Sequence, residues 1–252
     1  MKIKILGSGT STGVPEIGCT CSVCTSANPK DKRLRASAMV YTDDSMLLID
    51  CGPDFREQML HTPFQKIDGV LITHEHYDHV GGLDDLRPFC RFGEVSVYSE
   101  SYIVENLRAR MPYCFAESKY PGVPDIRLKS VLPNTPFYIN QTEIIPIRVS
   151  HYQLPILGFR IGKLAYITDM LTMPEESYEL LHDLDVLVLN ALRVTPHISH
   201  QNLSQAIETA TRIGAKQTYF THLSHQMGLH AEIEEQLPEN ISFAYDGLEI
   251  SF

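Results

Sequence analysis

The sequence is short of positive charge and contains no long uninterrupted apolar run. It carries 21 lysines and arginines against 31 aspartates and glutamates, which gives a formal net charge of −10. Long nucleic acids bind by releasing counterions to a basic surface, so this balance argues against such a partner. No stretch approaches the roughly 18 apolar residues of a membrane-spanning helix. The apolar run that begins at Lys2 is short, and it predicts a first strand rather than the core of a signal peptide.

Internal repeats, low-complexity tracts and flexible Ser/Gly linkers are absent as well. The 252 residues are 43% hydrophobic, enough for one sizeable core, and we predict a single domain over residues 1–252. Short β-type runs alternate with helical patterns, as in stacked sheets flanked by helices. We expect strands at residues 2–6, 37–41, 46–50, 69–73, 95–98, 143–150, 157–161, 164–168, 185–190, 217–221 and 242–246, and helices at 83–92, 100–110, 175–182, 202–213 and 229–236.

The local pattern predicts one helix clearly, at 202–213, and leaves the structure of residues 112–136 open. Asn202 and Gln205 have the spacing of a capping box, and an apolar stripe follows, so the helix at 202–213 is the clearest. Residues 112–136 are rich in proline and loop-forming residues. That segment is either a surface excursion beside a pocket or a long connection.

The strongest chemical signal is the segment THEHYDH after the strand expected at 69–73. It contains His74, His76, Asp78 and His79 within six residues. In an extended segment, residues two apart point the same way, so His74 and His76 can hold one ion. Asp78 and His79 can face a second ion as the chain turns into a helix. Imidazole and carboxylate ligands suit zinc, manganese or iron.

Three further metal-capable residues each follow an apolar run directly: His151, Asp169 and His222. Binding sites in α/β sheets form at the carboxyl ends of strands, so we expect these side chains at one edge. The sequence therefore predicts two ions with a shared water between them. The first ion would be held by His74, His76 and His151, the second by Asp78, His79 and His222, and Asp169 would bridge both.

Cys19, Cys21 and Cys24 form a second cluster, and three cysteines match neither a disulfide nor a complete zinc site. A disulfide uses two cysteines and a closed tetrahedral zinc site uses four ligands, so the spacing alone leaves a fourth ligand to be found. The other cysteines, Cys51, Cys90 and Cys114, are scattered among core-like residues. This usage predicts a reducing compartment, most simply the cytoplasm.

The order His-x-His-x-Asp-His, followed by a distant His, Asp and His, resembles the ligand order of the metallo-β-lactamase superfamily. The resemblance implies an αββα sandwich, in which two mixed β-sheets are flanked by helices. It also implies that Asp50, in the segment LLIDCG, supports the metal-site loop from behind the ligands.

Further motifs resemble one branch of that superfamily, which contains the phosphonate-pathway phosphodiesterase that opens a cyclic ribose phosphate. These motifs are GSGTSTGVP, GCTCSVC, THLSHQ and AYDGLEI, and together with the ligands they span nearly the whole chain. The resemblance implies a structural zinc held by Cys19, Cys21, Cys24 and His225. It also implies a phosphodiesterase acting on small cyclic or nucleotide-like phosphates, and a homodimer.

A proton donor for the leaving group is sought outside the ligand set. The segment HISHQ contains His197 and His200, and imidazole is well tuned for this role near neutral pH. The residues alone do not choose between them, but the resemblance implies His200. Asp78 can orient, or accept a proton from, the shared water. Lys32, Arg33 and Arg35 either add charge near a phosphate or form a solvated charge run.

Three alternatives stay open at this stage. A nuclease of the tRNA 3′-processing type often carries an inserted arm between the third histidine and the bridging aspartate, whereas only 17 residues separate His151 from Asp169 here. Hydrolysis of an ester, thioester or lactone is compatible with the same ligands. A metal-stabilised binding protein without turnover is disfavoured because no ligand is missing. The choice between zinc and manganese also stays open.

Overall fold

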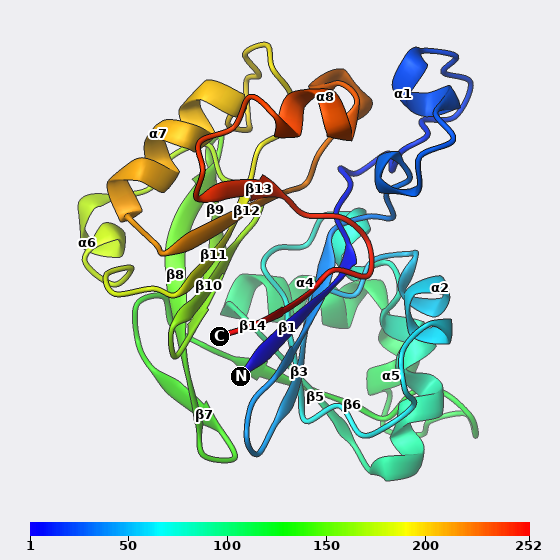
Figure 1. Ribbon diagram of the computed structural model, residues 1–252. Coiled ribbons are helices and arrows are strands. Elements are labelled where there is room, and N and C mark those ends of the chain that lie inside the picture. The colour runs from blue at the N-terminus through cyan, green and yellow to red at the C-terminus, as the bar shows by residue number, and fades with distance from the viewer.

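The computed structural model describes residues 1–252 and contains two seven-stranded sheets packed face to face (Figure 1). In the first sheet the order is β14-β1-β2-β3-β4-β5-β6. Strands β3 to β6 pair in parallel, whereas β1, β2 and β14 are antiparallel to their neighbours. The strands are β1 (Lys2–Gly7), β2 (Ser37–Tyr41), β3 (Met46–Ile49), β4 (Gly69–Leu71), β5 (Val95–Ser99), β6 (Ile126–Ser130) and β14 (Glu249–Ser251).

The second sheet has the order β13-β12-β11-β10-β9-β8-β7. Strands β10 to β13 are parallel, and β7 to β10 form antiparallel pairs. The strands are β7 (Phe137–Ile139), β8 (Thr142–His151), β9 (Leu154–Ile161), β10 (Leu164–Ile167), β11 (Val186–Asn190), β12 (Gln217–Thr221) and β13 (Ile241–Phe243). Both sheets are therefore mixed, as predicted.

Helices cover the outer faces of both sheets. The first sheet is covered by α2 (Phe55–Leu60), the 3₁₀ segment η2 (Leu83–Phe92), α4 (Ser101–Arg110) and α5 (Pro112–Phe115), and the second by α6 (Glu175–Tyr178), α7 (Leu203–Ile213) and α8 (His230–Glu234) (Figure 1). The remaining short elements are α1 (Ser22–Thr25), η1 (Pro29–Asp31), α3 (Tyr77–Val80) and η3 (His225–Met227). No helix combines the length and the apolar composition needed to cross a bilayer.

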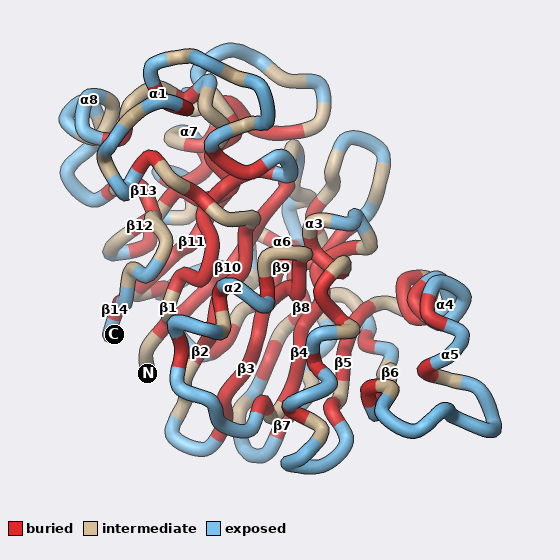
Figure 2. The backbone as a smooth tube through the Cα atoms, turned by 90° about the vertical axis from the view of Figure 1, so that its right-hand side faces the viewer, coloured by how far each residue is buried: buried red, intermediate tan, exposed pale blue.

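Three apolar layers hold this arrangement together. The layer between the sheets includes Ile3, Leu47, Phe159 and Tyr166, all fully buried. Two outer layers lie between each sheet and its helices. Figure 2 shows that the strands are coloured mostly as buried, because each sheet faces apolar side chains on both sides. Burial on both faces explains why the strands read as continuous apolar runs in the sequence.

The predicted αββα architecture is confirmed, and each expected strand is present with small shifts at its ends. The helix at 202–213 has its capping box, in which Asn202 and Gln205 exchange side-chain to main-chain hydrogen bonds of 3.0 Å. The segment 83–92 is a 3₁₀ segment instead of an α-helix. It contains Pro88, which has no N–H and clashes with the preceding turn of an α-helix.

Residues 112–136 are a connection with structure of its own. They contain α5 and the edge strand β6, which the abundance of proline obscured. Two other short edge strands, β7 and β14, also escaped prediction. Such strands have half-exposed alternating side chains and only three residues each, so their apolar signal is weak.

Candidate metal centre

The predicted ligands lie at one edge of the sandwich because the strands that carry them end there. Asp50 follows β3, the THEHYDH segment follows β4, and His151 is the last residue of β8. Asp169 and His222 follow β10 and β12, which run parallel on either side of β11. The carboxyl ends of neighbouring parallel strands meet at the same edge, which gathers side chains that are far apart in the sequence.

One group of donors consists of Asp78, His79, Asp169 and His222. One donor atom from each lies within 4.8 Å of all the others. His79 Nε2 is 3.1 Å from Asp78 Oδ2 and 3.2 Å from Asp169 Oδ2, and His222 Nε2 is 3.2 Å from Asp169 Oδ1. Both Nε2 atoms are buried and neither makes a hydrogen bond of acceptable geometry. Buried polar atoms without partners are rare, so a divalent cation fits this donor set.

The structure also brings together the histidines that were expected to hold the other ion. His74 Nε2 and His76 Nδ1 face each other at 3.0 Å, as two nitrogens directed at one ion would. The structure groups His151 with Asp169 and His200 within 4.8 Å, and its ring centroid lies 5.1 Å from that of His76. Asp169 therefore belongs to two donor groups, which is the position that a bridging carboxylate needs.

Three histidines each donate their Nδ1–H to a fixed acceptor. The acceptors are Asp50 Oδ2 at 2.7 Å for His79, Thr73 Oγ1 at 3.0 Å for His74, and the Asp169 carbonyl at 2.9 Å for His151. Each of these bonds sets the tautomer and leaves Nε2 free to bind a metal. Asp50 also accepts the main-chain N–H of Thr73 at 2.9 Å, so it organises the start of the ligand segment. This agrees with the supporting role that the sequence implied for Asp50.

The charge balance at the centre favours a cation. Burial alone would lower the pKa of His79, but the carboxylates of Asp169, Asp50 and Asp78 outweigh burial and raise this pKa well above its usual value. Three carboxylates around one imidazole leave an excess of negative charge in a buried place. Such charges need a metal or a cationic partner.

The main chain is strained where it presents these groups. Asp50, Asp169 and His222 have φ values of 60°, 59° and 58°, in the left-handed region that residues other than glycine seldom adopt. Each such residue costs on the order of 1–3 kcal/mol, and residues of this kind cluster at functional sites. Each one lies just beyond a strand end, where the chain must turn sharply to direct its side chain into the centre.

Asn190, at the end of β11, is a supporting residue that the sequence reading missed. Its Oδ1 accepts the N–H of Met170 at 2.7 Å, and its Nδ2 donates to the Met170 carbonyl at 2.9 Å. These two bonds fix the residue that follows Asp169, and thus hold the strained turn. Its position in the sequence could have indicated this role. Asn190 is the last residue of β11, which lies between β10, the strand before Asp169, and β12, the strand before His222.

Replacing Asn190 with alanine should weaken metal binding at the centre by roughly 10- to 100-fold, the usual effect of losing a group that orients a ligand. A competition titration with a chromophoric chelator measures this. Asn140→Ala is the matched control, because Asn140 Nδ2 likewise donates to a carbonyl, that of Asp44, at the other end of β8 from His151. Equal metal affinities in the two variants would show that Asn190 does not orient the ligands.

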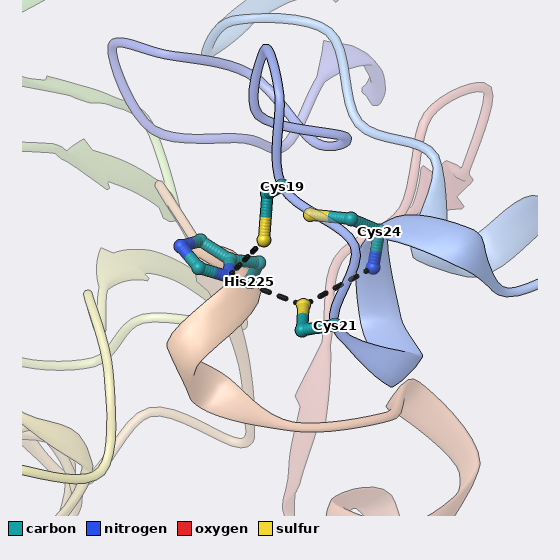
Figure 3. Close-up of side chains that lie close together, drawn as sticks. All are labelled: Cys19, Cys21, Cys24 and His225. Carbon is teal, nitrogen blue, oxygen red and sulfur yellow. Dashed lines mark hydrogen bonds between the residues drawn. The ribbon is translucent and has the colours of Figure 1, made fainter.

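The three clustered cysteines meet His225 at the top of the molecule, where α1 lies against η3 (Figures 1 and 3). The donors of Cys19, Cys21, Cys24 and His225 lie within 4.8 Å of one another. His225 Nδ1 is 3.5 Å from Cys19 Sγ and 3.3 Å from Cys21 Sγ. A main-chain N–H of Cys24 and the His225 ring lower the pKa of Cys21 to about 6, which favours the thiolate that zinc binds.

Glu16 lies behind this cluster. Its Oε2 is 3.4 Å from His225 Nε2, on the side of the ring that faces away from the sulfur atoms. A carboxylate in this position fixes the ring and raises the basicity of Nδ1. The cluster therefore has the four donors, and the outer carboxylate, of a closed tetrahedral zinc site.

Cys21→Ser should lower thermal stability because it removes one ligand of the proposed structural zinc. We expect a loss of at least about 2 kcal/mol, which corresponds to a drop in Tm of roughly 4–8 °C for a domain of this size. Calorimetry with metal analysis of the same sample measures both effects. Cys90→Ser, at a half-buried cysteine outside the cluster, is the control. A Cys21→Ser protein with native Tm and native metal content would rule out this zinc site.

Residues 46–223 match the family described as "Beta-lactamase superfamily domain". The chain belongs to the beta-lactamase superfamily. A crystal structure of a diphosphatase from the PhnP family superposes with a TM-score of 0.92 and 41% identity, covering 100% of this chain and 97% of that one. Zinc-bound PqqB from Methylobacterium extorquens superposes with a TM-score of 0.80, over the whole of both chains, at 20% identity, which shows the shared fold alone.

A curated relative from Porphyromonas gingivalis, named octanoyltransferase, is 47% identical over 251 residues. That match covers 99% of this chain and 51% of the relative, so the chain spans about half the length of the curated relative. Superfamily membership, the fold and the grouped donors together support a metal-dependent hydrolase.

Of the two histidines considered as proton donors, the structure brings His200 to the metal centre. His200 is buried, and its Nδ1 lies 3.7 Å from Asp169 Oδ1 without a hydrogen-bond partner. Burial, with a smaller contribution from neighbouring histidines, lowers the pKa of His200 to about 3. His197 is half-buried, its ring centroid is 5.1 Å from that of His200, and its Nδ1 contacts Ser199 Oγ at 3.2 Å.

The basic residues considered for phosphate binding have protein partners. Lys32 donates to the Cys24 carbonyl, and Arg33 is buried, where it donates to Ser8 Oγ and the Ala244 carbonyl. Arg35 forms an ion pair with Asp54 at 2.8 Å. Lys32 and Arg33 thus hold the N-terminal loops together, and only Arg35 keeps a partly exposed guanidinium.

Proposed function

We propose that this chain is a metal-dependent phosphodiesterase that hydrolyses small cyclic or nucleotide-like phosphates. The observation that carries the proposal is the position of Asp169, which belongs to two donor groups. Two bound ions in such a site activate a water molecule and neutralise charge on the phosphoryl oxygens. Zinc or manganese suits the mixed imidazole and carboxylate donors.

The side chains of this protein have separable roles in the proposed reaction. Asp78 lies at the edge of the donor set, with a side chain that is 12% exposed, so it can orient the attacking water and accept its proton. His200 is outside the six predicted terminal ligands, and its ring stacks on that of His222 with 5.0 Å between the centroids. It is the residue that can donate a proton to the departing oxygen. Asp50 and Asn190 keep the ligands in place.

Phosphate chemistry is favoured by one of the structural relatives. The PhnP-family protein is described as a diphosphatase, and it aligns with the whole of this chain at 41% identity. A long RNA substrate is disfavoured by the connection between His151 and Asp169. It consists of a two-residue turn, β9, and a second short turn into β10, with no inserted arm. The net charge of −10 argues in the same direction.

Acyl hydrolysis is the second candidate, and one observation favours it. The relative that shares 47% of its residues with this chain is named octanoyltransferase. Only about half of that protein corresponds to this chain, so its named activity does not transfer with the alignment. An octanoyl thioester is nevertheless a specific substrate to test.

Cell location and assembly are also proposals. All six cysteines are free, which agrees with a reducing, cytoplasmic environment. A homodimer is implied by the resemblance to the phosphodiesterase branch, and sedimentation velocity would test it.

A substrate panel tests the function. The protein, loaded with Zn²⁺ or with Mn²⁺, is incubated with a ribose 1,2-cyclic phosphate, a 2′,3′-cyclic nucleotide, a nucleoside diphosphate and an octanoyl thioester. Phosphorus NMR follows the phosphates and thiol release follows the thioester. We expect ring opening of a cyclic phosphate with an inert thioester. Turnover of the thioester alone would replace the phosphodiesterase proposal by the acyl hydrolase.

A further inference from the structure

The segment from Arg193 to His200, called the His200 loop here, connects β11 to α7 and carries both histidines discussed above. Its ends are joined by main-chain hydrogen bonds from Leu192 N to the Gln201 carbonyl at 3.0 Å and from Leu203 N to the Arg193 carbonyl at 2.9 Å. Between these ends the loop has little apolar support, since Val194 is 48% and Ile198 is 70% exposed. A segment with few buried contacts opens easily unless polar bonds hold it.

The guanidinium of Arg193 supplies such bonds. Its Nε donates to the Thr195 carbonyl at 3.2 Å and its Nη2 to the Pro196 carbonyl at 2.6 Å, both inside the loop. Its Nη1 donates to Gln226 Oε1 at 2.8 Å, outside the loop. All three nitrogens are used, and the planar fork that reaches these acceptors is specific to arginine. Arg193 thus joins the His200 loop to η3.

Gln226 follows His225, the histidine of the cysteine cluster, on the same short turn η3. Ser224, the residue before His225, donates its N–H to the Leu192 carbonyl at 2.9 Å. A continuous set of contacts therefore runs from the cysteine cluster through η3 and Arg193 to the His200 loop.

We propose that Arg193 is a positioning residue that fixes the His200 loop to the cysteine cluster. Metal binding at the cluster then orders the loop and the imidazole of His200. The catalytic consequence rests on the function proposed above, whereas the ordering of the loop does not. The cluster then stabilises the fold and also sets the position of a catalytic side chain on a separate segment.

Hydrogen exchange measured by mass spectrometry on the metal-loaded protein tests the ordering directly. In Gln226→Ala, exchange in peptides covering residues 192–203 should rise by about tenfold, as expected for one hydrogen bond to a charged donor. Gln226→Glu keeps an acceptor oxygen for Arg193 and should exchange like the native protein. Arg193→Lys should behave like Gln226→Ala, because an ammonium cannot reach three acceptors. Gln236→Ala, at another exposed glutamine whose side chain bonds only the Glu232 carbonyl, is the control.

The cluster is tested in the same way. Cys21→Ser should raise exchange in the same peptides. If Cys21→Ser does not fold, Glu16→Gln takes its place, because it keeps all four donors and removes only the carboxylate that fixes the His225 ring. Native exchange in Gln226→Ala and Arg193→Lys, or native exchange after metal loss from the cluster, would overturn the proposal.

Turnover is measured on the same variants. Where exchange rises, kcat should fall with little change in KM for substrates with an alkoxide leaving group. Raised exchange with unchanged turnover would instead count against the role of His200, and leave the coupling standing.

Discussion

Asp169→Asn should abolish most of the hydrolytic activity, with a loss of roughly 10³-fold or more in kcat/KM. Asparagine has the same shape, so the turn held by Asn190 remains, but it offers only one neutral oxygen where both donor groups share a carboxylate. The loss of charge would weaken the binding of both proposed ions, each of which would contribute several kcal/mol to stabilising the transition state. Steady-state kinetics with metal analysis of the same protein measure activity and occupancy together.

The matched control for this variant is Asp183→Asn. Asp183 has a φ of 55°, so the same substitution is made in the same left-handed backbone conformation, at an exposed position. Any effect of the substitution on the backbone alone would be seen in both proteins. An Asp169→Asn protein that keeps its metals and native turnover would show that the two donor groups do not share this carboxylate.

The second large effect is expected for His200→Ala, at about 10²- to 10⁴-fold in kcat, the usual range for a lost general acid. The loss should be confined to substrates whose leaving group is an alkoxide, because a nitrophenolate departs without a proton. Metal content should be unchanged if His200 acts only as a proton donor. A lower metal content would show that His200, which shares a donor group with His151 and Asp169, also binds an ion. His197→Ala, in the same loop, should retain most of the activity.

The environment of His200 makes this test informative. Burial lowers the pKa of its ring to about 3, so the imidazole is neutral in the free protein at neutral pH. A bound phosphodiester brings a negative charge to the site, and a nearby negative charge favours the protonated ring. Equal losses with alkoxide and nitrophenolate leaving groups would show that His200 acts by holding Asp169, from which it is 3.7 Å away, and not as an acid.

The gathering of the candidate ligands could be predicted from the sequence because each stands at a place that local pattern reveals. His151, Asp169 and His222 follow apolar runs, and parallel strands end at a common edge, so strand boundaries are enough to bring them together. The spacing within THEHYDH is likewise local. The fold followed from the same runs, since strands buried on both faces give an unmistakable apolar signal.

The supporting residues could not be predicted in this way because they act through tertiary contacts. Asn190 bonds Met170, 20 residues away in sequence, and Arg193 bonds Gln226, 33 residues away. The position of Asn190 at a strand end marked it as a candidate, but nothing in the sequence indicated its partner, and nothing local distinguishes Arg193 from an ordinary polar residue. Glu16 is a similar case, because its partner His225 lies at the far end of the chain. The fourth ligand of the cysteine cluster came from resemblance and not from spacing, for the same reason.

Activity as a function of bound metal tests the central claim most directly. The protein is freed of metal with a chelator, the cysteine cluster is refilled first, and turnover of a ribose cyclic phosphate is followed by phosphorus NMR as further ions are added. We predict that turnover is absent with only the cluster filled and rises as two more ions bind, in line with a two-ion centre. Full turnover by a protein whose histidine and aspartate centre holds no metal would contradict the account.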